Sequence, residues 1–107
     1  MEYINFEDFK KVEIKIGKII SAEKIESSNK LLKLQVDFGT EQRQILAGIA
    51  KYYEPEQLVG KLCPFVFNLE TKMMGEIESQ GMILCADDGG PVLLHPDKEI
   101  KPGSIIK

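Results

Sequence analysis

The sequence contains few of the residues from which catalytic or metal sites are built. Its 107 residues include no tryptophan, one histidine and two cysteines. The single histidine, His95, does not cluster with the cysteines along the chain as the ligands of a zinc site do. No phosphate-binding loop or dinucleotide fingerprint occurs, and no serine or cysteine lies in a nucleophile motif. We therefore expect a protein without a catalytic centre of its own, without a metal and without a cofactor.

The cysteines and the hydrophobic segments are typical of a soluble intracellular protein. Cys63 and Cys85 both lie in apolar stretches, which favours buried, unreactive thiols over a disulfide. No apolar run approaches the ~20 residues that cross a bilayer. Residues 1–12 lack the apolar core of a signal peptide. We expect a cytoplasmic protein that does not contact membranes.

Length and composition indicate one globular domain spanning residues 1–107. Hydrophobic residues make up 43% of the chain and charged residues 29%, values that argue against disorder. A chain of this size forms a single domain. It buries roughly two-thirds of its unfolded surface on folding, which is enough for one hydrophobic core.

Alternating hydrophobic residues predict a small all-β protein. In the clearest strand, residues 32–38, Leu32, Leu34 and Val36 point to one face and polar residues to the other. The other expected elements are strands over 12–20, 43–49, 61–69 and 81–86, a return strand at 91–95, a helical turn at 6–10 and a short helix within 53–60.

Three features modify this pattern. Gly17 suggests a bulge or bend in the first strand, and Pro64 suggests a bulge or an edge position in the fourth. Residues 71–80 are expected to form a polar loop. The order of parts is that of a five-stranded OB-fold, a Greek-key barrel, with one short helix and a C-terminal extension. The strand count alone fits an unrelated small barrel nearly as well.

The charge is distributed unevenly along the chain. The net charge of −3 argues, as a bulk value, against a nucleic-acid partner. Residues 1–9 carry a net charge of −3, residues 10–72 carry +3 and residues 73–107 carry −3. The middle section can therefore present a basic surface to phosphates. Solvated lysines on outward-facing strand positions would give the same pattern.

Two sequence blocks resemble a known family. The first is YEPEQLVGK at residues 53–61, and the second is MGEIESQGMIL at residues 74–84, preceded by Asn68, Leu69 and Lys72. They are similar to the tRNA-binding OB-fold domain of methionyl-tRNA synthetase, where it occurs as a C-terminal domain or a beta subunit. Related domains end bacterial phenylalanyl-tRNA synthetase beta chains and occur in the endothelial monocyte-activating polypeptide. The resemblance covers about residues 6 to 107, and the catalytic synthetase motifs are absent.

The resemblance implies a non-catalytic domain that binds tRNA by shape and backbone contacts and assists aminoacylation. Its partners would be tRNA and the catalytic body of methionyl-tRNA synthetase, as a separate subunit or within one chain. Lysine and arginine can engage phosphates, neutral polar side chains can meet sugar hydroxyls or phosphate oxygens, and methionines can lie against a base. The residues implied are Lys30, Lys33, Arg43, Asn68, Lys72, Met73, Ser79, Gln80 and Met82.

Some of these residues have structural alternatives. Asn68 can satisfy backbone groups in a turn, Ser79 can close the loop onto the next strand, and Met82 can belong to the core. Tyr52 and Tyr53 are the only candidates for base stacking and can equally cap one end of the barrel.

Two questions of partnership stay open at this stage. Relatives commonly dimerise, and the apolar segment from Pro91 to Ile106 can form a homodimer interface or pack on its own barrel. An export-related chaperone of the same fold, which binds peptides, is the alternative function. The net acidity and the adaptable methionines would suit it.

Overall fold

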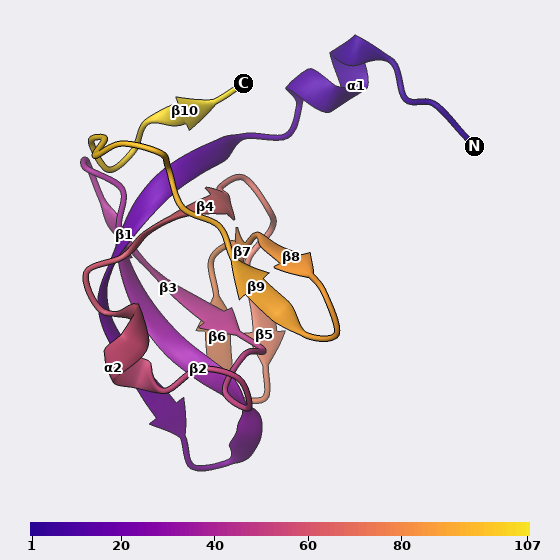
Figure 1. Cartoon of the computed structure of the whole chain (residues 1–107). Helices are drawn as coiled ribbons and strands as arrows, with labels where there is room; N and C mark the ends of the chain where they lie inside the picture. Colours follow the sequence, from indigo (N-terminus) through magenta and orange to yellow (C-terminus); the bar gives the residue numbers. More distant parts are fainter.

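The computed structural model describes all 107 residues. The elements in chain order are α1 (Phe6–Lys10), β1 (Ile14–Ile25), β2 (Ser28–Asp37), β3 (Gln42–Ala47), α2 (Pro55–Leu58), β4 (Leu62–Val66), β5 (Lys72–Met74), β6 (Ile77–Ser79), β7 (Met82–Ile83), β8 (Cys85–Asp87), β9 (Pro91–Leu93) and β10 (Ile105–Ile106). Figure 1 shows a strand-rich body with the short helix α1 projecting from it. No helix is long and apolar enough to cross a membrane.

The main sheet is antiparallel and curls into an OB-like barrel, which confirms the predicted fold class. Its strand order is β3-β2-β1-β4-β7. The long strand β1 pairs with β4 through Ile14–Lys18 and with β2 through Lys18–Ile25, so it serves both halves of the sheet. The two ends meet where the N–H of Gln80 donates to the carbonyl of Gln44 on β3, at 2.9 Å.

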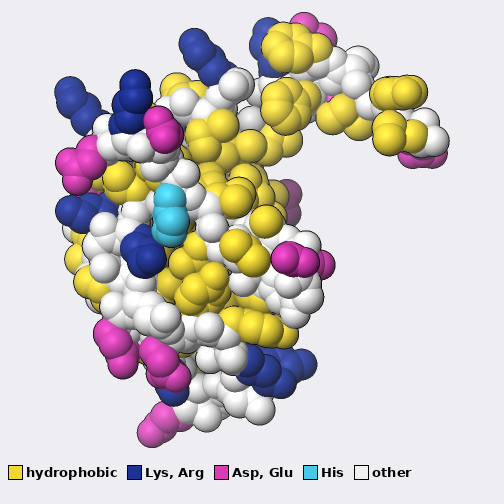
Figure 2. Space-filling view, viewed as in Figure 1, with side chains coloured by type: hydrophobic (Ala, Val, Ile, Leu, Met, Phe, Trp, Pro, Cys, Tyr) yellow, Lys and Arg dark blue, Asp and Glu magenta, His cyan; other side chains and the backbone are white.

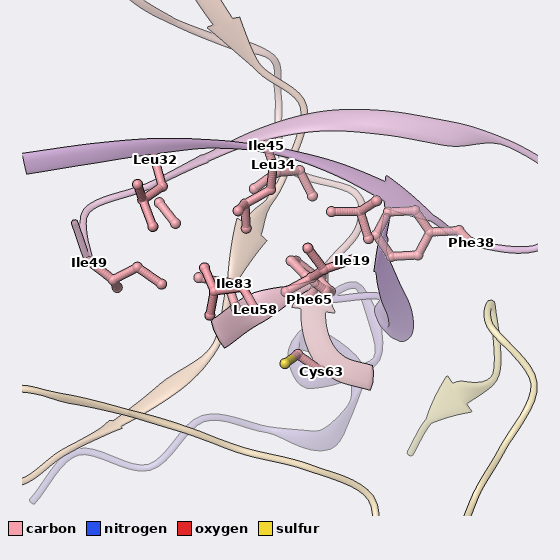
Figure 3. Packing of buried hydrophobic residues seen from close by; sticks show 12 residues of the cluster. Ile19, Leu32, Leu34, Phe38, Ile45, Ile49, Leu58, Cys63, Phe65 and Ile83 are labelled. Atoms are coloured by element: carbon pink, nitrogen blue, oxygen red, sulfur yellow. The ribbon is translucent and has the colours of Figure 1, made fainter. Parts of the chain in front are cut away.

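The core lies inside this barrel, as the alternation of β2 predicts. Leu32, Leu34 and Val36 are completely buried, and Phe38 is nearly so. Figure 3 shows these side chains meeting residues from the other strands and Leu58 of α2. Burial of Leu58 holds α2 against the barrel, with Pro55 in the first turn, where its missing N–H costs nothing.

Gly17 has a different role from the one expected. β1 runs through it without a break, and the two irregularities in its pairing with β2 lie between Ile19 and Ser21 and between Lys24 and Ile25. A Cβ at Gly17 would collide with side-chain atoms of Val36 and Phe38. The glycine is therefore required for the close approach of β1 to two core side chains, and the expected bulge at this position is wrong.

Pro64 lies where the pairing of β4 with β7, which covers only Phe65 and Val66, has ended. The expected bulge is therefore wrong, whereas the expected edge position applies on the side of β7. β4 is flanked by β1 and β7, and its register with β1 is continuous. Ile16, opposite Pro64, donates to the carbonyl of Ser104 and accepts from the N–H of Gly103. It therefore needs no donor from the proline. On the other side, the carbonyl of Pro64 accepts from the N–H of Leu84 at 3.0 Å.

Several short elements differ from the sequence expectation. The expected loop at 71–80 contains the hairpin β5–β6, and the expected strand at 81–86 is divided into β7 and β8. β8 and β9 form the expected hairpin. The expected helical turn is present as α1, and the side chain of Asn5 caps it by accepting from the N–H of Asp8 at 2.8 Å.

Candidate nucleic-acid interface

The outward side of β2 and β3 carries the polar side chains of the two strands. Lys33 lies opposite Leu46, and Gln35 lies opposite Gln44, on the face away from the core. Leu46 is only 4% exposed although it does not belong to the core cluster. An apolar residue at an outward position is thus covered by other parts of the chain.

The cover is formed by the hairpin β5–β6 and by β7, which together with β3 surround a hollow of about 670 Å³. The hollow is lined by Leu46, Leu69, Glu70, Thr71, Lys72, Met73, Met74, Ser79, Gly81 and Met82. Four of the nine predicted tRNA-binding residues therefore meet here: Lys72, Met73, Ser79 and Met82. Met73 is 57% exposed and Met82 is 46% exposed. The alternative assignment of Met82 to the core is therefore wrong.

Ser79 and Gln80 attach this cover to β3. The buried hydroxyl of Ser79 accepts from the N–H of Leu46 at 2.9 Å and donates to the carbonyl of Gly81 at 3.0 Å. The side-chain carbonyl of Gln80 accepts from the N–H of Gln44 at 3.2 Å. Two side chains thus continue the hydrogen-bonding edge of β3 where no strand pairs with it. Their roles as tRNA contacts remain predictions, and the observed contacts are structural.

Arg43 shares the inward-facing parity of β3, because it is paired with the inward-pointing Val36. Its guanidinium stacks on Phe67, with Cζ 3.5 Å from the ring centroid. It also donates to the carbonyls of Phe67 and Gln80 and forms an ion pair with Glu41 at 3.0 Å. The side chain is only 19% exposed. These contacts favour a structural role, and the predicted phosphate contact of Arg43 is untested.

Asn68 links the end of β4 to the segment before β1. Its side-chain carbonyl accepts from the N–H of Glu13 at 2.8 Å, and its amide donates to the carbonyl of Lys11 at 2.6 Å. Both ends of the amide are therefore used by backbone groups. This is the structural alternative considered for Asn68, although contact with tRNA is not tested by it.

The lysines of the candidate site differ in whether an acidic side chain pairs with their charge. Lys33 pairs with Glu23 across the strands, with Nζ 2.7 Å from Oε1. Lys30 and Lys72 form no ion pair. Lys30 lies with Lys51 and Tyr52 along a second, shallow pocket. Lys72 at the rim of the hollow is thus the predicted cation whose charge is free beside exposed apolar side chains.

Sequence reasoning missed three residues of this surface, Lys51, Leu46 and Leu69. Leu46 could have been found, because in residues 43–49 it is an apolar side chain with the parity of the outward face.

Tyr52 and Tyr53, the two candidates for base stacking, have different surroundings. The hydroxyl of Tyr53 contacts the carbonyl of Pro91 at 3.4 Å and accepts from the N–H of Leu93 at 3.3 Å, whereas Tyr52 is 56% exposed.

The cysteines and the histidine lie away from this surface. Both cysteines are free, with Cys63 buried and Cys85 half-buried. Burial, and then the negative charge of the Cys85 thiolate, raise the pKa of the Cys63 thiol to about 11. Burial also raises the pKa of Cys85. The ring nitrogen Nδ1 of His95 is 3.0 Å from the carbonyl of Leu62, to which it can only donate.

The barrel and its hollow, with Lys72 at the rim, define a small binding module. The chain belongs to the family described as "Putative tRNA binding domain", which matches residues 14–105.

Relatives among known proteins are methionine–tRNA ligases. The ligase of Archaeoglobus fulgidus is 53% identical over 107 residues, covering 98% of this chain and 16% of that protein. The ligase of Thermotoga maritima is 54% identical over 105 residues, covering 96% of this chain and 16% of that protein. The chain thus spans about one sixth of these relatives. It matches their tRNA-binding domain and is not itself catalytic.

Solved structures show the same fold along the whole chain. A methionyl-tRNA synthetase (MetRS)-related protein from Pyrococcus horikoshii is 41% identical, with a TM-score of 0.93 and 100% of both chains covered. The chaperone CsaA from Bacillus anthracis is 33% identical, with a TM-score of 0.91, covering 99% of this chain and 100% of that one.

Proposed function

We propose that this domain binds tRNA for a methionyl-tRNA synthetase in the cytoplasm and adds a general contact to the specific ones made by the catalytic body. The observation that carries the proposal is the match of residues 14–105 to the tRNA-binding family, together with synthetase relatives. Linking a weak contact to the catalytic body, covalently or as a subunit, makes it intramolecular and raises the overall affinity.

The hollow between β3, β5–β6 and β7 is the part of the surface that we assign to tRNA. Lys72 offers a free charge to a phosphate, and Met73 and Met82 offer flexible apolar surface to a ribose or base. Lys33 lies beside the hollow, because it is paired across the strands with Leu46, which lines the hollow. No aromatic ring lines the hollow, which favours docking by shape over stacking on successive bases.

The test is a filter-binding titration of the chain with total tRNA at two salt concentrations. Affinity should fall linearly on a log–log plot, by a slope of about −0.9 per duplex phosphate contact. Lys72→Ala should weaken binding and make the slope shallower, whereas Lys98→Ala, an exposed lysine beside His95, should change neither. Unchanged tRNA binding by Lys72→Ala would place the tRNA surface elsewhere.

Peptide binding is the second candidate function, because the CsaA chaperone shares the fold and the hollow exposes two methionines. The same titration separates the two functions. Binding of an apolar peptide should change little with salt, because it does not release counterions as binding to a polyanion does.

We further propose that the chain forms a homodimer through its N-terminal segment and C-terminal tail. The hairpin β8–β9 packs on its own barrel, since Leu93 contacts the core. By contrast, Ile105 is 70% exposed, and α1 buries none of its residues. Figure 2 shows hydrophobic side chains along the N-terminal arm, residues 1–12, where it stands clear of the barrel.

An apolar groove of about 230 Å³ lies between this arm and the tail. It is lined chiefly by Phe6, Phe9, Val12, Ile14, Ile105 and Ile106. Large apolar side chains gathered on one exposed patch mark an interaction site. Residues of both chain ends contribute to the patch, so a second copy would bring an equivalent patch in a two-fold arrangement.

A further inference from the structure

The register of β4 and β7, continued two positions beyond the last paired residues, would bring the two cysteines opposite one another. Phe65 pairs with Ile83. At the next position, Pro64 and Leu84 are joined by the hydrogen bond that the N–H of Leu84 donates to the carbonyl of Pro64. One further step in the same register would place Cys63 of β4 opposite Cys85, the first residue of β8. Because Pro64 and Leu84 occupy a hydrogen-bonded position of the antiparallel ladder, the cysteines occupy a non-hydrogen-bonded one.

That position suits a covalent bridge. Directly opposed residues at non-hydrogen-bonded positions have Cα atoms about 4.5 Å apart, within the ~4.4–6.8 Å that a disulfide spans. Independent contacts agree with the register. Cys63 belongs to the core cluster, and Cys85 packs against that same cluster.

No hydrogen bond between the strands fixes β8 to β4 at this position. Pro64 has no N–H to donate to β7, and after Leu84 the chain pairs with β9 instead. A covalent link between Cys63 and Cys85 would therefore supply a connection that the ladder lacks.

We propose that Cys63 and Cys85 form an intramolecular disulfide when the folded chain meets a small-molecule disulfide such as oxidised glutathione. The partly exposed Cys85 thiolate attacks the glutathione disulfide and releases one glutathione thiolate. The Cys63 thiolate then attacks the Cys85 sulfur of this mixed disulfide and releases the second. Two protein thiols lose two electrons and two protons, and the glutathione disulfide becomes two thiols.

The bridge would close the segment from Pro64 to Leu84 at its base. That segment carries β5, β6 and β7 and six of the nine predicted tRNA-binding residues: Asn68, Lys72, Met73, Ser79, Gln80 and Met82. Cross-linking restricts the unfolded chain, so the oxidised form should resist denaturation better. The proposal depends on the cysteines alone and stands whether or not the ligand is tRNA.

The test treats the full chain with oxidised glutathione under native conditions, followed by thiol counting, non-reducing peptide mapping and urea unfolding. We expect both thiols to be lost, one peptide pair to join Cys63 to Cys85, and the urea midpoint to rise and return on reduction. Cys63→Ser should stop at glutathione attached to Cys85. Cys85→Ser should leave Cys63 free, because Cys63 is buried. Thiols that react only in the unfolded chain, or bridges only between chains, would overturn the proposal.

The pH dependence gives a second readout. A thiolate is the attacking species, so the rate of each step should rise about tenfold per pH unit well below the thiol pKa. The closing step requires the Cys63 thiolate, and burial raises the pKa of this thiol, against the opposing effect of Lys61. The ring nitrogen Nδ1 of His95 faces the same sulfur at 3.8 Å. The mixed disulfide should therefore persist longer at neutral pH than in alkaline buffer, where it should close rapidly. A rate of closure that is independent of pH would contradict attack by Cys63.

Discussion

The residues that most resemble the tRNA-binding family serve the closure of the barrel as well as its surface. Ser79 is buried, and its hydroxyl satisfies the N–H of Leu46. Gln80 satisfies the N–H of Gln44. The conjunction of serine, glutamine and glycine at residues 79–81 thus has a physical reason that does not involve a ligand. At the N–H of Leu46 and at the N–H of Gln44, a side-chain oxygen takes the place of the backbone carbonyl that a neighbouring strand would supply.

Ser79→Ala should destabilise the fold. Removing the hydroxyl leaves the buried N–H of Leu46 without an acceptor, which costs about 1–3 kcal/mol. Urea unfolding followed by circular dichroism measures the loss. Ser27→Ala, at an exposed turn residue, is the matched control and should stay within about 0.5 kcal/mol of the parent. Equal stability of the two variants would show that Ser79 does not close the barrel.

At the residue scale, the sequence alone indicated which side chains carry suitable chemistry but not which are already engaged. Lys72, Met73 and Met82 lie on the exposed hollow, as a binding role requires. Arg43 and Asn68 make contacts with residues far away in the chain, at positions 67 and 80 and at positions 11 and 13. Such partners depend on how the barrel closes, which no local pattern specifies.

At the scale of the elements, regular alternation was a sufficient guide and short strands were not. β2 was predictable because four apolar residues alternate over seven positions. β5 and β6 have three residues each, too few to show a period of two. Gly17 was misread for a related reason. A glycine in a strand signals either a bulge or a close approach, and the approaching Val36 is not visible in the sequence near it.

Gly17→Ala should destabilise the packing of β1 on β2. The added methyl group would overlap Val36 and Phe38 in a core without room for it, at a cost of about 1–3 kcal/mol. Gly48→Ala is the matched control, because a Cβ there meets no atom within 4 Å. Thermal unfolding should show a lower midpoint for Gly17→Ala alone. Similar midpoints for both variants would contradict a tight approach at Gly17.

At the scale of the whole molecule, the bulk charge is a poor guide to the partner. Residues 1–9 and 73–107 each carry a net charge of −3, and residues 10–72 carry +3. The hollow lies where the basic and the acidic C-terminal sections meet, and its charged lining residues are Glu70 and Lys72. The chain ends carry the exposed apolar residues of the arm and tail. The proposed tRNA surface, around the hollow, and the proposed dimer surface, at the termini, are therefore formed by different elements.

This separation predicts that the oligomeric state can be changed without loss of the barrel. Deleting residues 1–9 removes Phe6 and Phe9 from the groove, and the barrel should stay folded because α1 buries none of its residues. Light scattering at micromolar concentration should give twice the 12.1 kDa chain mass for the parent and about one chain for the truncated form.

The double substitution Phe6→Ala/Phe9→Ala should act in the same direction. Val59→Ala, an exposed apolar residue outside the groove, should leave the dimer intact. The truncated chain should still bind tRNA with the same salt slope per chain, since Lys72 and the methionines lie on other elements. A parent chain that scatters as a monomer would refute the dimer, and loss of tRNA binding on truncation would show that the two surfaces are not separate.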